Sequence, residues 1–293
     1  MTNPRLIDLD LLRGYPLPHV PEDSGKEDRG RLLVIAGSRE LAGAALLAGV
    51  AALRAGAGKL QIGTAESIAA PLAAAVPEAR IIGHPETEEG CIAEEGIAPL
   101  IKWAKAAQAV AIGCGMQHGP PLQRLFEGLL GCGAEIPLVL DAAVLDCLGA
   151  LQRQVAQWRG GTILLPHGGE MARLLGMERE EVEADPLDAA QQAAERFNAM
   201  ALIKGAPSYV VAPSGDSFTY PGGGVGLATS GSGDVLSGIV GGLCARGAEP
   251  LTALLWGVWL HGEAGRALSE RVGRLGFLAR ELPGEIPRLL PDN

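Results

Sequence analysis

The sequence has few aromatic residues and no excess of basic ones. Phe, Trp and Tyr make up 4% of the 293 residues against 47% for all hydrophobic types, which predicts a globular fold with an aliphatic core. The 24 basic residues are outnumbered by 34 acidic ones, giving a net charge of −10. A phosphate backbone requires a basic surface, so nucleic acid is not an expected partner. A small phosphorylated ligand needs only a local anion site and stays possible.

Cysteine and long apolar runs are also scarce. The five cysteines form no Cys-x-x-Cys pair and are odd in number, which predicts reduced thiols in a cytoplasmic protein. The first residues, MTNPRLIDLD, lack the basic and apolar regions of a signal peptide. The most apolar stretch, Leu251 to Leu260, is about ten residues and too short to cross a bilayer. We therefore expect a soluble protein with no membrane partner.

Several catalytic motifs are missing. The histidines form no His-Glu-x-x-His and have no metal-ligand spacing with cysteine, so no dedicated metal site is expected. The chain also lacks a P-loop, a clean Gly-x-Gly-x-x-Gly after the first strand and a Gly-x-Ser-x-Gly elbow. These absences disfavour a hydride-transfer enzyme and an α/β-hydrolase.

Short apolar runs alternate with helical stretches, which is typical of parallel strands buried on both faces. Residues 209–211 and 217–220 flank a turn and predict an antiparallel hairpin. We expect one α/β domain over residues 31–293, with helices on both faces of a mostly parallel sheet, preceded by an amino-terminal arm (1–30) with little core. The predicted parallel strands cover residues 31–36, 59–64, 79–82, 109–113, 137–141, 161–166 and 200–205.

The strongest chemical signal is Ser230-Gly231-Ser232-Gly233-Asp234 at the start of a predicted helix. Free amides and the positive end of the helix dipole make such a turn an anion site. Asp234 would be costly beside a phosphate unless it acted as a base or met a metal. The alternative is that Ser232 and Asp234 only cap the helix.

Three more polar residues lie at the end of a predicted strand or directly after one, at the edge where α/β sheets bind ligands. His167, which precedes two glycines and Glu170, is placed to contact a ligand. Alternatively, His167 is structural and Glu170 interacts favourably with the dipole of the following helix. Lys204 needs an anionic partner, such as a nucleotide phosphate, unless it extends to solvent. Asp141 either faces the same edge or caps the following helix.

Six segments carry a resemblance to a known family, at residues 31–64, 111–120, 138–145, 163–176, 203–211 and 231–247. In this order they resemble the ATP/ADP-dependent NAD(P)H-hydrate dehydratase family of the ribokinase-like superfamily. The motif WLHGEAG (259–265) also fits that family.

The resemblance implies a three-layer ribokinase-like fold and an enzyme that dehydrates the S form of hydrated NADH or NADPH, driven by hydrolysis of ADP or ATP. Asp234 matches the catalytic aspartate and Gly231, Ser232 and Gly233 would form the anion hole. The positions that match substrate contacts are Ala44, Gly115, His167 and Asp234. Those that match nucleotide contacts are Lys204, Gly205, Ala206, Pro207, Ser208 and Gly233.

The resemblance also implies partners. Mg²⁺ held mainly by phosphates and water is expected, as is a homotetramer, with apolar helices near residues 43–56 and 251–260 as candidate subunit interfaces. Many family members carry an epimerase domain ahead of this core; with about 30 residues there, the epimerase is expected on a separate chain or is absent.

Five positions depart from the family pattern. Ser232 replaces a threonine and keeps the hydroxyl. Cys114 replaces a proline. The other three remove a polar or rigid contact, so we expect them to affect substrate affinity rather than the type of reaction; they are Leu165 for Thr, Gly168 for Pro and Gly224 for Asn. Two alternatives remain open: a related kinase that phosphorylates a hydroxymethyl group, and a nucleotide-sensing module without turnover.

Overall fold

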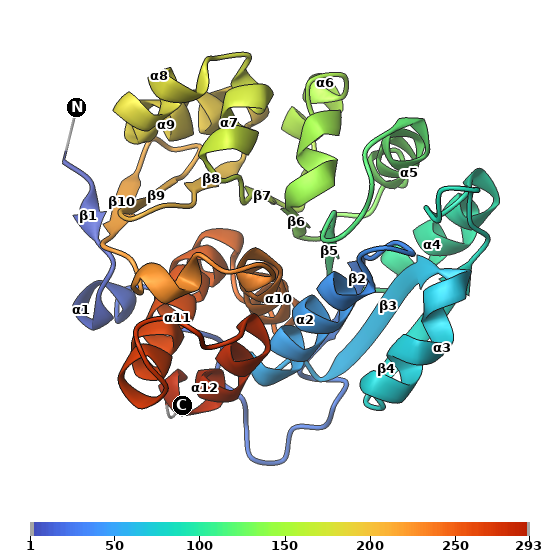
Figure 1. Cartoon of the computed structure of the whole chain (residues 1–293), viewed down its shortest axis with the longest axis horizontal. Helices are drawn as coiled ribbons and strands as arrows, with labels where there is room; N and C mark the ends of the chain where they lie inside the picture. Colours follow the sequence, from blue (N-terminus) through green and yellow to red (C-terminus); the bar gives the residue numbers. More distant parts are fainter. Residues whose placement is uncertain (1–2, 292–293) are drawn as a thin grey trace.

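A single mixed sheet runs through the molecule and carries helices on both faces (Figure 1). The computed structural model describes residues 3–291, so the ends of the predicted arm and domain lie outside the described residues. The predicted α/β class is confirmed. In sheet order, the strands of the described residues are β1 (Arg5–Leu6), β10 (Ser217–Tyr220), β9 (Ser208–Val211), β8 (Met200–Ile203), β7 (Thr162–Leu164), β6 (Leu138–Leu140), β5 (Ala109–Ile112), β2 (Arg31–Ile35), β3 (Lys59–Ala65) and β4 (Ala79–His84).

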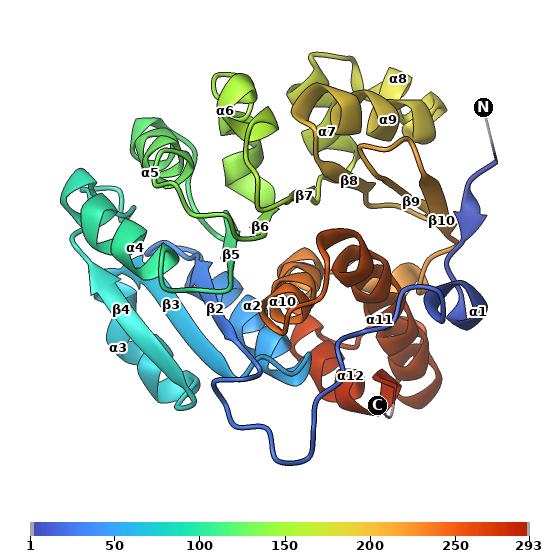
Figure 2. The ribbon, with the colours of Figure 1, turned by 180° about the vertical axis from the view of Figure 1, so that it is seen from behind.

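The helices form two layers, seen from both sides in Figures 1 and 2. One layer packs on the sheet with α2 (Ala42–Arg54), α3 (Glu66–Ala75), α10 (Ser232–Ala245), α11 (Pro250–Arg271) and α12 (Leu282–Leu289). The other contains α4 (Ile97–Ala104), α5 (Pro120–Leu130), α6 (Gln152–Ala156), α7 (Gly168–Leu175), α8 (Arg179–Ala184) and α9 (Pro186–Phe197). A short helix, α1 (Leu9–Leu12), lies in the arm, and 3₁₀ turns cover Glu94–Gly96, Ala142–Cys147, Val225–Leu227 and Ala279–Glu281. In the described part of the chain, none of the helices combines the length and apolarity needed to span a membrane.

The central strands are mainly apolar because each is covered on both sides. In β2, Leu32 and Val34 join the core beneath α2 and α10, whereas Leu33 and Ile35 join the core beneath α4 and α5. Alternate side chains of a strand point to opposite faces, so a continuous apolar run is what two helical layers require. The predicted hairpin is also confirmed, since β9 and β10 pair antiparallel.

Helices α2 and α10 pack with their backbones in close contact. A Cβ atom at Gly238 would overlap the Ala48 carbonyl oxygen, and one at Gly242 would lie 2.6 Å from the Ala52 carbonyl oxygen. Only glycine permits such an approach. This contact fixes α10 against α2 and thereby places the first turn of α10.

Most of the described arm is exposed or half-buried, but its first part also adds to the sheet and the core. Strand β1 pairs in parallel with β10. Ile7, Leu12 and Leu17 are buried in the core formed with α10 and α11. Without the arm, β10 would be an unpaired edge of the sheet. The arm covers that edge and the apolar surface beside it.

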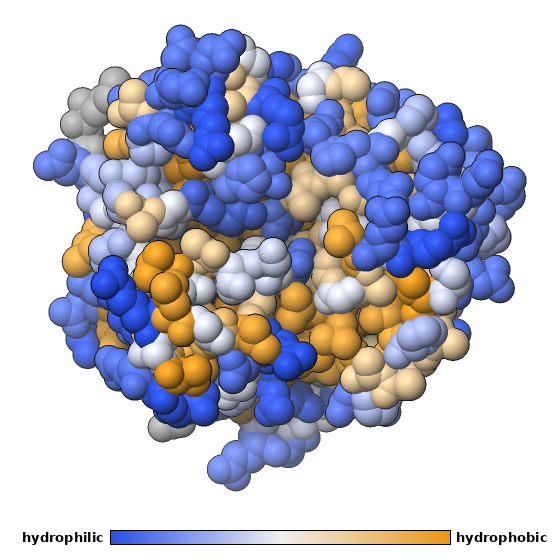
Figure 3. Space-filling view, in the orientation of Figure 1, coloured by the Kyte–Doolittle hydropathy of each residue, from blue (hydrophilic) through white to orange (hydrophobic). Residues whose placement is uncertain are grey.

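One of the two predicted subunit-interface helices is not available for that role. Residues 252–260 are buried within the chain itself, so the apolar stretch of α11 belongs to the monomer core. On α2, Leu46, Leu47 and Val50 are half-buried. Figure 3 shows the face of the molecule that is seen in Figure 1. Its apolar surface gathers mainly over the half that carries α2, α11 and α12, whereas the half over α7–α9 is mostly hydrophilic.

Candidate active site

The candidate residues meet at the carboxyl ends of the parallel strands. The Gly37 amide donates to the Cys114 carbonyl (2.8 Å), which joins the ends of β2 and β5. The Lys204 amide donates to the Pro166 carbonyl (2.9 Å), which joins the ends of β7 and β8. The start of α10 lies over this edge, since a Cβ atom at Gly233 would be 3.4 Å from Lys204 Nζ.

The first turn of α10 presents amides that no protein group uses. Gly231 is the N-cap, with φ +88° and no capping side chain, and the helix begins at Ser232. Within residues 3–291, the amides of Gly231, Gly233 and Asp234 have no hydrogen-bond partner. The Ser232 amide donates to the Thr229 carbonyl (3.2 Å), so this part of the predicted anion hole is already engaged. The geometry disagrees with a purely capping role and favours an anion site.

Asp234 is half-buried in this first turn. Burial raises the pKa of its carboxyl group, while the nearby Cys114 thiol and the Lys204 charge act in the opposite direction. A carboxylate with a raised pKa beside free amides is suited to accept a proton from a substrate.

Lys204 finds its anionic partner within the protein. Its Nζ lies 2.8 Å from Asp141 Oδ1 and 3.8 Å from Glu170 Oε2. Burial raises the pKa of Asp141 to about 6, although Lys204 opposes the shift. Burial alone would lower the pKa of Lys204, but the two carboxylates outweigh it and raise the pKa. Lys204 therefore stays charged. From the sequence, its partner was expected to be either a nucleotide phosphate or solvent, whereas in the structure it is the carboxylate of Asp141.

Removing the lysine tests this buried pair. Lys204→Met should lower the free energy of unfolding by about 3 kcal/mol near neutral pH, because Asp141 is then buried as an uncompensated charge. Protonating Asp141 removes that charge, so the loss should be smaller at about pH 5 than at about pH 8. Urea unfolding at both pH values measures it. The double variant Asp141→Asn/Lys204→Met should recover most of the stability, and an equal loss at both pH values would contradict the assignment.

His167 caps α7. Its Nδ1 accepts from the amides of Gly169 (3.0 Å) and Glu170 (3.3 Å), and Glu170 accepts from the His167 amide (2.8 Å). Burial lowers the pKa of His167 despite the opposing charge of Glu170. The structural role is therefore present, and the ring side chain is 57% exposed, which leaves it accessible to a ligand.

The other predicted substrate residues, Ala44 and Gly115, are neighbours. Gly115 has φ +64°, and a Cβ atom there would lie 2.5 Å from Ala44 Cβ and 2.6 Å from the Leu41 carbonyl oxygen. A side chain at Gly231 would contact Leu47, one turn further along α2. The amino-terminal end of α2 therefore connects the Ala44–Gly115 contact with the anion loop.

The predicted nucleotide segment 204–208 forms an exposed turn between β8 and β9. Ser208 Oγ donates to the Gly205 carbonyl (2.8 Å) and accepts from the Gly205 amide (3.2 Å). Ala206 and Pro207 are exposed at its tip. The tip of the turn is therefore exposed to solvent, next to the partly buried Lys204 at its start.

Two departures from the family pattern have a structural explanation. Leu165 is fully buried in the core, so its side chain packs there instead of facing a ligand. Gly224 has φ +100°, where a side chain is strained, and this backbone suits glycine. Cys114 is buried, and a Cβ atom at Gly168 would meet only Glu183 Cγ at 3.9 Å. The effect of the departures at residues 165, 168 and 224 on substrate affinity stays a prediction.

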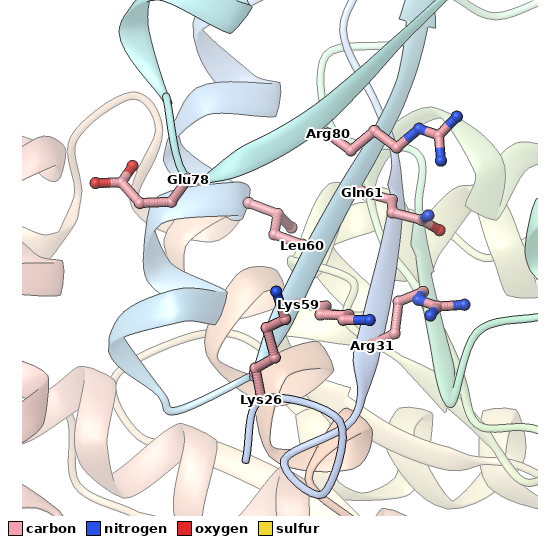
Figure 4. A pocket seen from close by; sticks show the side chains of 8 residues that line it. Lys26, Arg31, Lys59, Leu60, Gln61, Glu78 and Arg80 are labelled. Carbon is pink, nitrogen blue, oxygen red and sulfur yellow. The ribbon is translucent and has the colours of Figure 1, made fainter.

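A separate hollow of about 310 Å³ lies at the opposite edge of the sheet, where β2, β3 and β4 begin. Figure 4 shows Arg31, Gln61 and Arg80 on one side of these strands, with Glu78 pointing away. Three of its four cations already have partners: Lys59 pairs with Glu27, Arg31 donates to the Ala106 carbonyl (3.0 Å), and Arg80 lies 4.1 Å from the Trp103 ring centre. The hollow is no part of the candidate site. It is lined by Lys26, Arg31, Gly58, Lys59, Leu60, Gln61, Glu78 and Arg80.

His261 was not among the residues expected at the site from the sequence. The structure places its Nε2 2.9 Å from Ser232 Oγ and 3.0 Å from the Ser232 carbonyl oxygen. The two residues are far apart in the chain and meet only because α10 packs on α11. The motif around residues 259–265 was the one signal that could have drawn attention to this histidine.

The sheet order and the two helical layers define the ribokinase-like fold. A solved ribokinase-like superfamily protein from Enterococcus faecalis has the same fold, with a TM-score of 0.84 at 24% identity, covering 97% of this chain and 94% of that one. The chain belongs to the NAD(P)H-hydrate dehydratase family, whose model matches residues 32–288.

Two similar proteins support the same family. An ADP-dependent (S)-NAD(P)H-hydrate dehydratase of Xanthomonas campestris is 44% identical over 99% of this chain and 98% of its own length. The crystal structure of an ADP/ATP-dependent NAD(P)H-hydrate dehydratase from Bacillus subtilis, co-crystallised with ATP/Mg²⁺, has a TM-score of 0.84. It is 30% identical and covers 99% of this chain and 98% of that chain.

Proposed function

We propose that this enzyme dehydrates the S form of hydrated NADH or NADPH and consumes ADP, or ATP, in doing so. The observation that carries the proposal is Asp234 in the first turn of α10, beside unused amides, in a chain of the dehydratase family. A purely binding module would gain nothing from a half-buried carboxylate next to phosphate oxygens.

The chemistry follows from the poor leaving ability of a hydroxyl group. Asp234 accepts the hydroxyl proton while the hydroxyl oxygen attacks the terminal phosphoryl group of ADP, releasing AMP. Phosphate then leaves together with a proton from the adjacent carbon, forming the double bond of NADH. The amides of Gly233 and Asp234 stabilise the negative charge on the transferred group.

Nucleotide binding is assigned to the turn 204–208 and Gly233, with the substrate on the side of Ala44, Gly115 and His167. Mg²⁺ fits as an ion held by phosphates and water. Among the described residues, no three His, Cys, Asp or Glu side chains cluster to hold a metal, and Asp141 is already bound to Lys204. The ion would shield the phosphate charge when bound.

The backbone at Gly231 offers a test of the anion loop. Gly231→Ala should lower kcat/KM for NADH regeneration by about 100-fold, because alanine is strained at φ +88° and its Cβ atom would press on Leu47 and Ala279, displacing the loop. Gly215 has the same φ of +88° in the β9–β10 turn with open space around it. Gly215→Ala therefore carries the backbone strain alone and should leave kcat/KM within about 2-fold. Equal kinetic losses in both variants would contradict the role of the loop.

The alternative function is phosphorylation of a hydroxymethyl substrate by the same Asp234 and anion loop. Purified protein, Mg²⁺ and ADP or ATP are incubated with NADH hydrate in one series and with hydroxymethyl-bearing heterocycles in another. Nucleotide-dependent recovery of NADH absorbance supports the dehydratase. A stable phosphorylated product without NADH formation would establish the kinase instead.

Three wider properties belong to this proposal. The half-buried leucines of α2 are the candidate contact of a homotetramer, which light scattering tests; a monomer would reject it. The five cysteines are unpaired in the described chain, which is consistent with a cytoplasmic location. Because only the S form is dehydrated, an NAD(P)H-hydrate epimerase is the expected functional partner.

A further inference from the structure

His261 on α11 contacts the first residue of the anion-binding helix. Its Nε2 lies 3.0 Å from the Ser232 carbonyl oxygen and 2.9 Å from Ser232 Oγ. Ser232 is itself 5% exposed, so the contact lies behind the anion loop on the side away from solvent. Neither the proton transfer nor the phosphoryl transfer described above uses His261.

A hydrogen bond to the carbonyl requires one particular state of the imidazole. A carbonyl oxygen only accepts hydrogen bonds, so Nε2 donates to it only when Nε2 carries the ring proton, whereas an unprotonated Nε2 would accept from the Ser232 hydroxyl. Burial lowers the pKa of His261 to about 4, and the ring is therefore neutral near pH 7. With the proton on Nε2, the N–H lies within hydrogen-bond reach of both the carbonyl and the hydroxyl oxygen of Ser232.

The Ser232 carbonyl and the Gly233 amide are the two ends of one peptide group. A peptide group is planar, so a hydrogen bond that fixes the carbonyl also fixes the direction of the N–H at its other end. Polarising the carbonyl strengthens the same amide as a donor. Gly233 N–H is one of the amides without a protein partner, and its residue faces Lys204 Nζ at the candidate phosphate site.

We propose that His261 is a positioning residue that holds the Ser232–Gly233 peptide group, and so aims the Gly233 amide at the phosphoryl group in transfer. The inference rests on the proposed function. A preorganised amide stabilises charge that develops in the transition state more than charge already present in bound ADP. Its loss should therefore appear in kcat rather than in KM.

Two substitutions separate the hydrogen bond from packing. His261→Leu keeps an apolar volume but removes the N–H; kcat should fall about 10-fold, with KM for ADP within about 2-fold. His261→Gln can place an amide N–H near the position of Nε2 and should recover kcat to within about 3-fold of the wild type. Melting temperatures of both variants report any loss of packing. Equal losses of kcat in the two variants, or a loss confined to KM, would overturn the proposal.

A second measurement keeps the inference separate from the proposed reaction. Nitrogen NMR of ¹⁵N-histidine-labelled wild-type protein should show His261 neutral with its proton on Nε2, its signal identified by its disappearance in His261→Gln. A ring protonated on Nδ1 alone cannot donate to the Ser232 carbonyl and would reject the inference, whether or not NADH is formed. Failure of the wild type to regenerate NADH would instead reject the proposed function.

Discussion

Replacement of Asp234 by asparagine should lower kcat for NADH regeneration by about 10³-fold while ADP still binds. The amide of asparagine has nearly the shape of the carboxylate but cannot take the hydroxyl proton. Binding should persist because the free amides of the loop and Lys204 are unchanged. Progress curves of NADH formation measure kcat, and calorimetric titration with ADP measures binding.

The control for this variant is Asp216→Asn, which changes an exposed aspartate in the turn of the β9–β10 hairpin and should leave kcat within about 2-fold. The wild type provides a further check. Only ionised Asp234 can act as base, and burial raises its pKa, so activity should fall as the pH drops through that raised value. Normal turnover by Asp234→Asn would remove Asp234 from the chemistry and favour a different base.

Gly238→Ala should lower the free energy of unfolding by about 3 kcal/mol or more. The added methyl group would overlap the backbone carbonyl of Ala48, and backbone cannot move aside as the end of a side chain can. Helices α2 and α10 would have to separate, which would also displace the first turn of α10. Chemical denaturation measures the loss, and the activity of the remaining folded protein reports the displaced turn.

Gly284→Ala is the matched control. Gly284 lies near the start of α12, is exposed, and has no atom within 4 Å of where its Cβ would be. Alanine there should raise the free energy of unfolding by about 0.5–1 kcal/mol, because glycine is the poorer helix former. If Gly238→Ala were as stable as the wild type, the close approach of α2 and α10 would be wrong.

The fold was predictable wherever local pattern determines it. Strands such as β2 and β5 are short apolar runs between glycines and helices, and burial on both faces requires that pattern. The pairing of β1 with β10 was not predictable, because a strand of only two residues near one end of the chain has no periodicity that indicates a distant partner. The apolar stretch of α11 could likewise face another subunit or the monomer core, and composition does not distinguish the two.

The candidate site was predictable as a set of residues but not as a network. Position after a strand indicated Asp141, His167 and Lys204 separately, since such residues share one edge of the sheet. The ion pair between Lys204 and Asp141 depends on side-chain directions across two strands, which spacing does not determine. The contact of His261 with Ser232 depends on how two helices pack, and no local signal records that geometry.

The most direct test follows NADH and inorganic phosphate together after NADH hydrate and ADP are mixed with the enzyme and Mg²⁺. One phosphate and one AMP are expected for each NADH formed, with little phosphate released when the hydrate is omitted. NADH formation without nucleotide consumption, or nucleotide consumption without NADH, would contradict the central claim that phosphoryl transfer at Asp234 drives the dehydration.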